Sequence, residues 1–170
     1  MRRISDGGIA ELKKMESVEP YVYTDSAGYQ TIGVGHKITP HELDSGLLLI
    51  DGHAVRWIGG LTPEQIDGLL RADLAAAEEA VESCVTVPLT DNQFAALVSF
   101  VFNCGATAFK DSSVLRVLNQ GHYDMVPSML RMWNKITVRV VDVDGIKRVK
   151  KVSPGLVRRR ESEIKLWLTP

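Results

Sequence analysis

The sequence predicts an α+β protein in which a short helix, a small β-rich region, a long helix and a helical bundle follow one another. Three observations support this order. β-prone runs and turn residues alternate between Tyr21 and Ile58, capping boxes begin apolar-striped helices at Thr62 and Thr90, and a further helix pattern follows Ser153. This arrangement is typical of an α+β fold, here with a β-rich N-terminal lobe and a mainly helical C-terminal lobe.

The length and composition are those of one compact globular unit. The chain has 170 residues, of which 45% are hydrophobic and 24% are charged, so disordered and fibrous classes are excluded. Cys84 and Cys104 lie beside apolar residues, which favours buried free thiols. A single disulfide between them is the alternative if the protein works outside the cytoplasm.

Charge is distributed unevenly along the chain. Residues 1–85 carry 7 Lys and Arg against 14 Asp and Glu, whereas residues 146–170 carry 8 against 2. A basic terminus favours an anionic partner such as cell-wall polymer, lipid headgroups or nucleic acid. Pairing of these arginines with the acidic half of the same protein is an equally good interpretation.

The first 60 residues predict a helix and two hairpins. The helix covers residues 5 to about 17, with Ser5 or Asp6 as N-cap. Glu16 falls at its C-terminal end, where the helix dipole disfavours a carboxylate. A hairpin with strands at 21–24 and 30–32 follows, and Gly33 and Gly35 indicate a bulge or close backbone approach. A second hairpin over 47–58 turns on residues 51–52, an Asp-Gly pair.

The rest of the chain predicts mainly helices. We expect them over residues 62–83, from 90 to about 103, from 112 or 113 to 119, over 123–133, and from 153 to about 168. Residues 138–152 predict a third hairpin, which turns at Asp144-Gly145.

Three polar residues near the N-terminus suit glycoside hydrolysis, which needs a protonated carboxyl and a second group that manages water. The helix end and the apolar neighbours Met15 and Val18 would favour the protonated form of Glu16 near neutral pH. Asp25, in a polar turn, would stay ionised and orient a water, and Thr31 would offer a hydroxyl to help hold it. By themselves these residue types are common in solvated surfaces.

The surrounding sequence resembles phage-type lysozymes of glycoside hydrolase family 24. The resemblance runs in order over nearly the whole chain. It rests on Glu16-x8-Asp25-x5-Thr31 with the following residues Ile32–His36, on residues 89–97 and Phe100-x-Phe102-Asn103-x-Gly105, and on Gly155–Val157 with Arg159, Arg160 and Glu163.

The resemblance implies a lysozyme-like fold and a muramidase activity. The enzyme would hydrolyse the β-1,4 bond between N-acetylmuramic acid and N-acetylglucosamine with inversion, without a cofactor. Glu16 would be the general acid, Asp25 the carboxylate that positions water, and Thr31 that water's second ligand. A single domain would comprise an N-terminal lobe over about 1–61, a linking helix over about 62–83 and a helical lobe over about 84–170, with the glycan between the lobes.

Two hairpins depart from the minimal family pattern. The one at 47–58 is interpreted as an insertion over the cleft, and the one at 138–152 carries four cations that suit anionic wall polymers: Lys147, Arg148, Lys150 and Lys151.

Two further residues are candidates for substrate binding. His36 lies in the matched motif, but pairing with a neighbouring carboxylate is the more ordinary role for such a histidine. Phe102 matches a position where the family's cleft touches sugar, and a core position is an equally good interpretation. His41, His53 and His122 show no ligand spacing, so no metal site is expected.

Three alternatives stay open. A lytic transglycosylase would use Glu16 alone and leave an anhydro sugar, which makes Asp25 and Thr31 unnecessary. A catalytically inactive wall-binding module would not need the three polar residues. Nucleic-acid binding by the basic terminus is disfavoured because aromatic residues are sparse there.

The expected partner is the glycan strand of peptidoglycan, and a monomer without a membrane anchor is expected. The N-terminus has no apolar stretch typical of a signal peptide. The resemblance therefore implies an endolysin that is made in the host cytoplasm and reaches the periplasm and cell wall after a holin opens the membrane. A virion-borne enzyme is the alternative.

Overall fold

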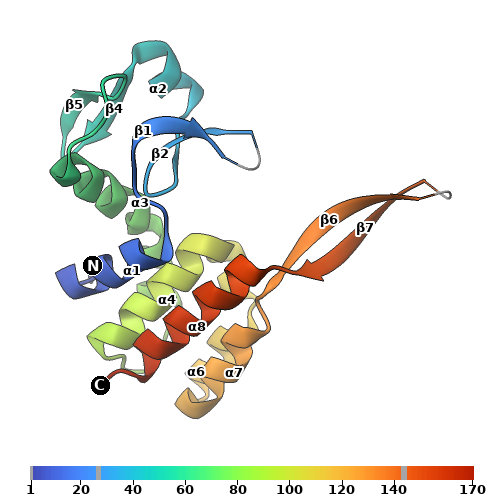
Figure 1. The fold of residues 1–170 in the computed structure, drawn as a ribbon. Coiled ribbons are helices and arrows are strands. Elements are labelled where there is room, and N and C mark those ends of the chain that lie inside the picture. Colours follow the sequence, from blue (N-terminus) through green and yellow to red (C-terminus); the bar gives the residue numbers. More distant parts are fainter. Residues whose placement is uncertain (1, 26–27, 143–144) are drawn as a thin grey trace.

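The computed structural model describes residues 2–25, 28–142 and 145–170. Within them, helices and three small antiparallel sheets form the predicted α+β arrangement (Figure 1). The two sheets formed by residues before position 60 lie at one end of α3 (Pro63–Cys84). The helices that follow α3 in the chain gather at its other end.

Helix α1 (Asp6–Met15) begins and ends as predicted. The Ser5 hydroxyl accepts a hydrogen bond from the Gly8 amide, and Glu16 is the C-cap residue with extended backbone. A Cβ at Gly8 would lie 2.9 Å from the Ala95 Cβ, so the glycine allows α1 to approach α4 (Asp91–Cys104) closely. Helix α1 therefore packs on α4 and α8 (Pro154–Leu168), although it precedes the sheet in the chain.

The first sheet has strand order β1-β2-β3 and carries the predicted hairpin. Its strands are β1 (Glu19–Thr24), β2 (Gln30–Gly33) and the unpredicted β3 (His36–Lys37). Gly33 is the last residue of β2 and a turn at Val34-Gly35 leads into β3; Gly33 and Gly35 have φ angles of 68° and 82°, which suit glycine. The register shift lies in β1, between Glu19 and Tyr23.

The second sheet confirms the hairpin on Asp51-Gly52. Strands β4 (Leu47–Ile50) and β5 (His53–Arg56) join through a turn in which both residues have positive φ, as a two-residue hairpin turn requires. The hairpin packs on α3 at Gly68, where a Cβ would lie 2.7 Å from the Ile50 side chain. Its inner face, with Leu48 and Ile50, is thus part of the core next to α3, and its interpretation as an insertion over the cleft stays a prediction.

Two short helices escaped prediction. Helix α2 (Pro40–Ser45) begins with a Thr39–Glu42 capping box and buries none of its residues, and α5 (Ala106–Lys110) follows α4 directly. The helix expected over 123–133 is shorter, with a 3-10 turn (Tyr123–Met125) leading into α7 (Val126–Arg131). Helix α6 (Ser113–Asn119) has the predicted bounds.

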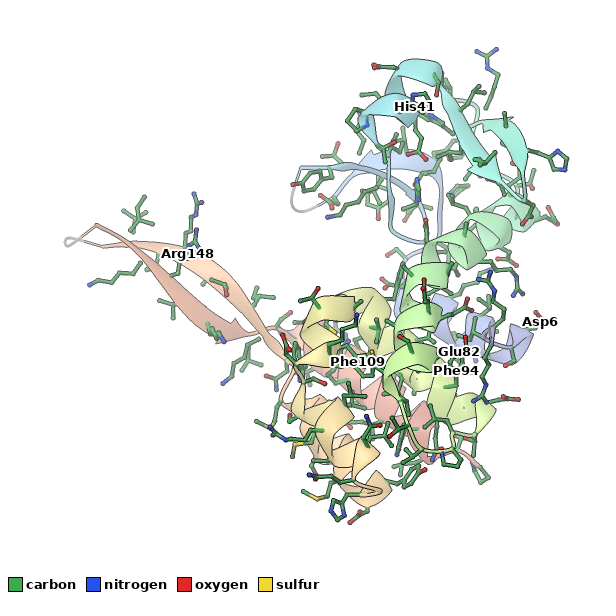
Figure 2. All side chains as sticks on the ribbon, turned by 180° about the vertical axis from the view of Figure 1, so that it is seen from behind. Asp6, His41, Glu82, Phe94, Phe109 and Arg148 are labelled. Atoms are coloured by element: carbon green, nitrogen blue, oxygen red, sulfur yellow. The ribbon has the colours of Figure 1, made fainter. Side chains whose placement is uncertain are left out.

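The third sheet is a two-stranded ribbon, β6 (Lys135–Asp142) and β7 (Gly145–Val152), that extends away from the helices (Figure 1). It begins three residues earlier than predicted. Arg148 lies on the ribbon clear of the helical lobe, whereas Phe94 and Phe109 lie inside that lobe (Figure 2). Below, "the ribbon" means β6 and β7.

The buried apolar side chains form one continuous cluster that includes residues of α1, β2, β4 and every α-helix from α3 to α8. Its centre is α4, where each residue from Phe94 to Val101 is buried. No helix in the described ranges is long and apolar enough to cross a membrane.

Candidate active site

Glu16 lies at the junction of α1 and the first sheet. Its carboxylate forms an ion pair with the Arg159 guanidinium of α8, 143 positions later in the chain. About a quarter of its side chain is exposed (26%), whereas the Arg159 side chain is almost fully buried. Of the two apolar neighbours expected around this carboxyl, Met15 is half-buried and Val18 is 41% exposed, and the side chain that contacts the carboxylate is a cation.

Arg159 is held in place by partners other than Glu16. Its Nε donates to Glu163 Oε1 over 3.2 Å, and its Nη2 donates to the Ser99 carbonyl oxygen over 3.2 Å. The remaining edge of the planar guanidinium meets Glu16 through Nη1. The arginine is thus oriented by α4 and α8 before it reaches the carboxylate.

Asp25 and Thr31 meet at the backbone of Tyr29, where β1 turns into β2. Asp25 Oδ1 accepts a hydrogen bond of 2.8 Å from the Tyr29 amide, and the Thr31 hydroxyl donates one of 3.1 Å to the Tyr29 carbonyl oxygen. Only 2% of Thr31 is exposed. One backbone unit therefore orients both side chains.

Tyr23 joins these groups, and the sequence interpretation missed it. It is the cross-strand partner of Thr31, so both side chains point to one face of the sheet. Burial raises the pKa of the Tyr23 phenol, and the negative charges of Glu19, Asp25 and Glu16 raise it further. The phenol consequently stays protonated near carboxylates from both α1 and the β1–β2 turn. The alternation of Tyr21 and Tyr23 along β1 was a signal that could have found it.

His36 lies in a polar cluster with α2 and α3. Its Nδ1 is 2.9 Å from Asp73 Oδ1, and its Nε2 is 3.3 Å from Glu42 Oε2. Burial alone would lower the pKa of His36, but the two carboxylates outweigh it and the pKa lies above its ordinary value. The carboxylate pairing expected for this histidine is present.

Phe102 and the cysteines occupy the helical lobe. Phe102 is half-buried: one part of its side chain packs against the core and the rest is exposed. Cys84 and Cys104 are both free and half-buried. Burial raises the pKa of the Cys104 thiol to about 11. Among the described residues, no cluster of three or more His, Cys, Asp or Glu side chains could hold a metal ion.

A hollow of about 760 Å³ lies at the root of the ribbon and does not include Glu16, Asp25 or Thr31. Arg160, which binds Glu163 and the Asn103 side chain, connects it with the charged cluster beneath Glu16. We therefore place the candidate active site at Glu16, Asp25 and Thr31 and not in this hollow. The lining combines C-terminal helices with the ribbon: Asn103, Cys104, Ser113, Met132, Trp133, Lys135, Ile136, Thr137, Lys150, Leu156 and Arg160.

Comparison with known proteins gives consistent matches. Residues 13–163 match the family model described as phage lysozyme. The chain is 40% identical to the endolysin of Salmonella phage P22 over 135 residues, which are 79% of this chain and 86% of that protein. It is 34% identical to the endolysin of Acyrthosiphon pisum secondary endosymbiont phage 1 over 164 residues, or 96% and 97% of the two chains.

Solved structures agree with the sequence matches. An endolysin from an Escherichia coli phage, FAHEc1, superposes with a TM-score of 0.79 at 35% identity, covering 98% of this chain and 94% of that one. The muramidase domain of SpmX from Asticaccaulis excentricus superposes with a TM-score of 0.77 at 34% identity, covering 100% of both chains.

Proposed function

This chain belongs to the phage lysozyme family, and on that premise we propose that it is a peptidoglycan muramidase that lyses the bacterial host of a phage. It hydrolyses the β-1,4 bond between N-acetylmuramic acid and N-acetylglucosamine. Related endolysins that match most of the chain, together with a structurally similar muramidase domain, support this assignment.

The observation that carries the proposal is the pair of carboxyls around Tyr23. Glu16 comes from the end of α1 and Asp25 from the β1–β2 turn, and the charges of both, together with that of the exposed Glu19, raise the pKa of the Tyr23 phenol. Glycoside hydrolysis requires two such groups with separate tasks, because one must donate a proton while the other handles water or charge. We assign Glu16 as the general acid, since its side chain is partly buried and it stands at the C-terminal end of α1, between the helical lobe and the first sheet.

Asp25 is assigned to position the attacking water. Its Oδ1 accepts a hydrogen bond from the Tyr29 amide, and the Thr31 hydroxyl donates one to the carbonyl oxygen of the same residue. A carboxylate and a hydroxyl held at one turn can together orient a water for attack on the sugar. A water that attacks from the face opposite the leaving group inverts the anomeric centre.

The cellular route follows from the proposed activity. The enzyme is a monomer that is made in the host cytoplasm and needs a holin to reach the periplasm and the cell wall. A lysis assay in cells that express the protein with and without a holin tests this. Equal lysis without the holin would contradict the route.

Substitution of Glu16 by Gln tests the reaction. The variant keeps the shape of the side chain but cannot donate the proton, so kcat for clearing of purified cell walls should fall by about 10²–10⁴-fold. Glu19→Gln is the matched control, because Glu19 is an exposed carboxylate on neighbouring β1 and should keep activity within about threefold. Equal clearing by Glu16→Gln and the native protein would remove Glu16 from its role.

Product analysis separates hydrolysis from its alternative. Mass spectrometry of digested peptidoglycan should give reducing muropeptides, whereas mainly anhydro-muropeptides would indicate a lytic transglycosylase. NMR of the first products should show the α-anomer, because inversion of a β-linked sugar produces it. An initial excess of the β-anomer would contradict the assignment of Asp25.

A further inference from the structure

Glu163 is a fully buried carboxylate on α8 that takes no direct part in the proposed reaction. Its Oε1 accepts hydrogen bonds from three donors: Ser99 Oγ at 3.0 Å, Arg159 Nε at 3.2 Å and Arg160 Nη2 at 2.9 Å. Its Oε2 lies 2.7 Å from Arg160 Nε, in ion-pair contact without the alignment of a hydrogen bond. A buried carboxylate with this many donors is held in one orientation.

The contacts of Glu163 determine how Arg159 faces the active site. A guanidinium is planar, so fixing two of its nitrogens fixes the third. Glu163 holds Nε and the Ser99 carbonyl oxygen holds Nη2, which directs Nη1 to the Glu16 carboxylate. Glu163 thus acts on Glu16 through one intervening side chain.

Charge balance adds a second effect. The cluster beneath the site contains two arginines and two carboxylates. Arg159, Arg160 and Glu163 are buried, and Glu16 is partly exposed. Burial raises the pKa of Glu163, and the two guanidiniums on it oppose that shift. Without the negative charge of Glu163, the charge of Arg159, which contacts Glu16, would be less compensated and would favour the ionised form of that carboxyl.

We propose that Glu163 is a positioning residue of the active site, which aims the Arg159 guanidinium at Glu16 and offsets the arginine charge so that Glu16 can hold a proton at working pH. This inference rests on the proposed role of Glu16 as the general acid. It differs from a purely structural role for Glu163, which would affect folding and leave the ionisation of Glu16 unchanged.

The other charged and titratable groups around the two carboxyls are placed as follows. On the side of the first sheet, the charges of Glu16, Glu19 and Asp25 all act on the Tyr23 phenol of β1. Glu163 faces Arg159 and Arg160 on its own helix and the Cys104 thiol of α4. Arg159 contacts both carboxyls, Glu16 through Nη1 and Glu163 through Nε.

Glu163→Gln is the direct test, since it removes the charge and keeps the shape. The alkaline limb of kcat/KM against pH reports ionisation of the general acid in the free enzyme. We expect that limb to move to lower pH by about one unit, because a lost negative charge favours the ionised form of Glu16. Near neutral pH kcat should fall about tenfold with little change in KM, and activity should recover as the pH is lowered.

Glu78→Gln is the matched control. Glu78 is also a buried carboxylate, and it accepts a hydrogen bond of 2.7 Å from Arg3 and one of 2.8 Å from the Ile4 amide, on α3 and away from Arg159. This variant should lose stability and keep the native pH profile. A profile for folded Glu163→Gln that coincides with those of the native protein and the control would overturn the proposal.

Ser99→Ala decides the matter if Glu163→Gln does not fold. It keeps every charge and removes one donor to Glu163 and one hydroxyl contact of Arg159. With every charge kept, a less well oriented Arg159 pairs less with Glu16, so the limb should move to higher pH, opposite to the effect of Glu163→Gln; an unmoved limb would contradict the proposal.

Carbon-13 NMR of the Glu16 carboxyl in the absence of substrate gives a readout that does not depend on activity. The midpoint of its titration should move to lower pH in Glu163→Gln and to higher pH in Ser99→Ala. A moved midpoint in a protein that fails to cleave peptidoglycan would support the positioning role and reject the proposed function. An unmoved midpoint in an active enzyme would do the reverse.

Discussion

At the scale of single residues, the candidate site depends on partners that orient polar groups from behind. Arg159 meets Glu16 with the one edge that Glu163 and Ser99 leave available. The Tyr29 backbone holds Asp25 and Thr31 in the same way. Activity should therefore respond to the orienting groups as well as to the carboxyls themselves.

Asp25 and Thr31 can be separated by conservative substitutions. Asp25→Asn should lower kcat by about 10²–10⁴-fold, because the amide cannot take up a proton from water. Thr31→Ser keeps the hydroxyl and should keep most of the activity. Thr31→Val removes the hydroxyl and should cost about 1 kcal/mol of stability as well as activity, because its hydrogen bond to Tyr29 is lost. Steady-state kinetics on purified walls, together with urea unfolding, measures both effects, and a fully active Thr31→Val would contradict the water-holding role.

His36 makes stability depend on pH. Its folded pKa is raised, so its contribution is complete below the unfolded value of about 6.5 and is lost as the pH rises through the folded value. His36→Gln should cost about 2 kcal/mol at pH 5.5, between the values for exposed and buried ion pairs, and clearly less at pH 9. Urea unfolding at the two pH values measures the difference. An equal loss at both would show that the ion pairs with Asp73 and Glu42 contribute nothing.

At the scale of elements, the ribbon differs from the other two sheets. The first two sheets contribute buried side chains such as Ile32 and Leu48, whereas β7 is exposed along its whole length. Arg139 lies directly opposite Arg148 in the register, and like charges in this position are unfavourable. The ribbon therefore adds little to the stability of the fold.

Shortening the ribbon tests this conclusion. Replacement of residues 137–150 by an Asn-Gly turn should keep the free energy of unfolding within about 0.5 kcal/mol, because none of the side chains described in this range belongs to the buried core. Circular dichroism during urea unfolding is the measurement. A loss above about 2 kcal/mol would mean that the ribbon packs on the helical lobe in solution.

At the scale of the whole molecule, α1 connects parts that the chain order separates. Ion pairs join it to α3 through Lys13–Asp67 and Arg71–Asp6, and Glu16 joins its end to α8. The apolar core continues from the sheets through α3 into the helical lobe. A division into lobes is therefore a matter of shape, and we expect the two to unfold together.

Calorimetry tests this expectation. One continuous core predicts a single thermal transition with equal calorimetric and van't Hoff enthalpies. Two resolved transitions, or a calorimetric enthalpy well above the van't Hoff value, would mean that the sheets and the helical lobe are separate units. The variant with the shortened ribbon is the control, since it should show the same single transition.

Local sequence signals were sufficient for most helices and for the hairpins. The Thr62–Gln65 and Thr90–Gln93 pairs form the predicted capping boxes, and each begins a long helix. The same signal at Thr39–Glu42 was overlooked because α2 has only 6 residues and no buried face, so no apolar periodicity accompanies it. Helix α5, with 5 residues, is too short to show periodicity either.

The position of Glu16 at the end of α1 and the turn that carries Asp25 were determined by the sequence itself, since capping and turn preferences act over a few residues. The cation on Glu16 was decided only by the tertiary structure. Arg159 lies 143 positions away, and its orientation depends on a buried carboxylate and a carbonyl oxygen on two packed helices. No local preference encodes such a contact, because it exists only once α1, α4 and α8 share one core.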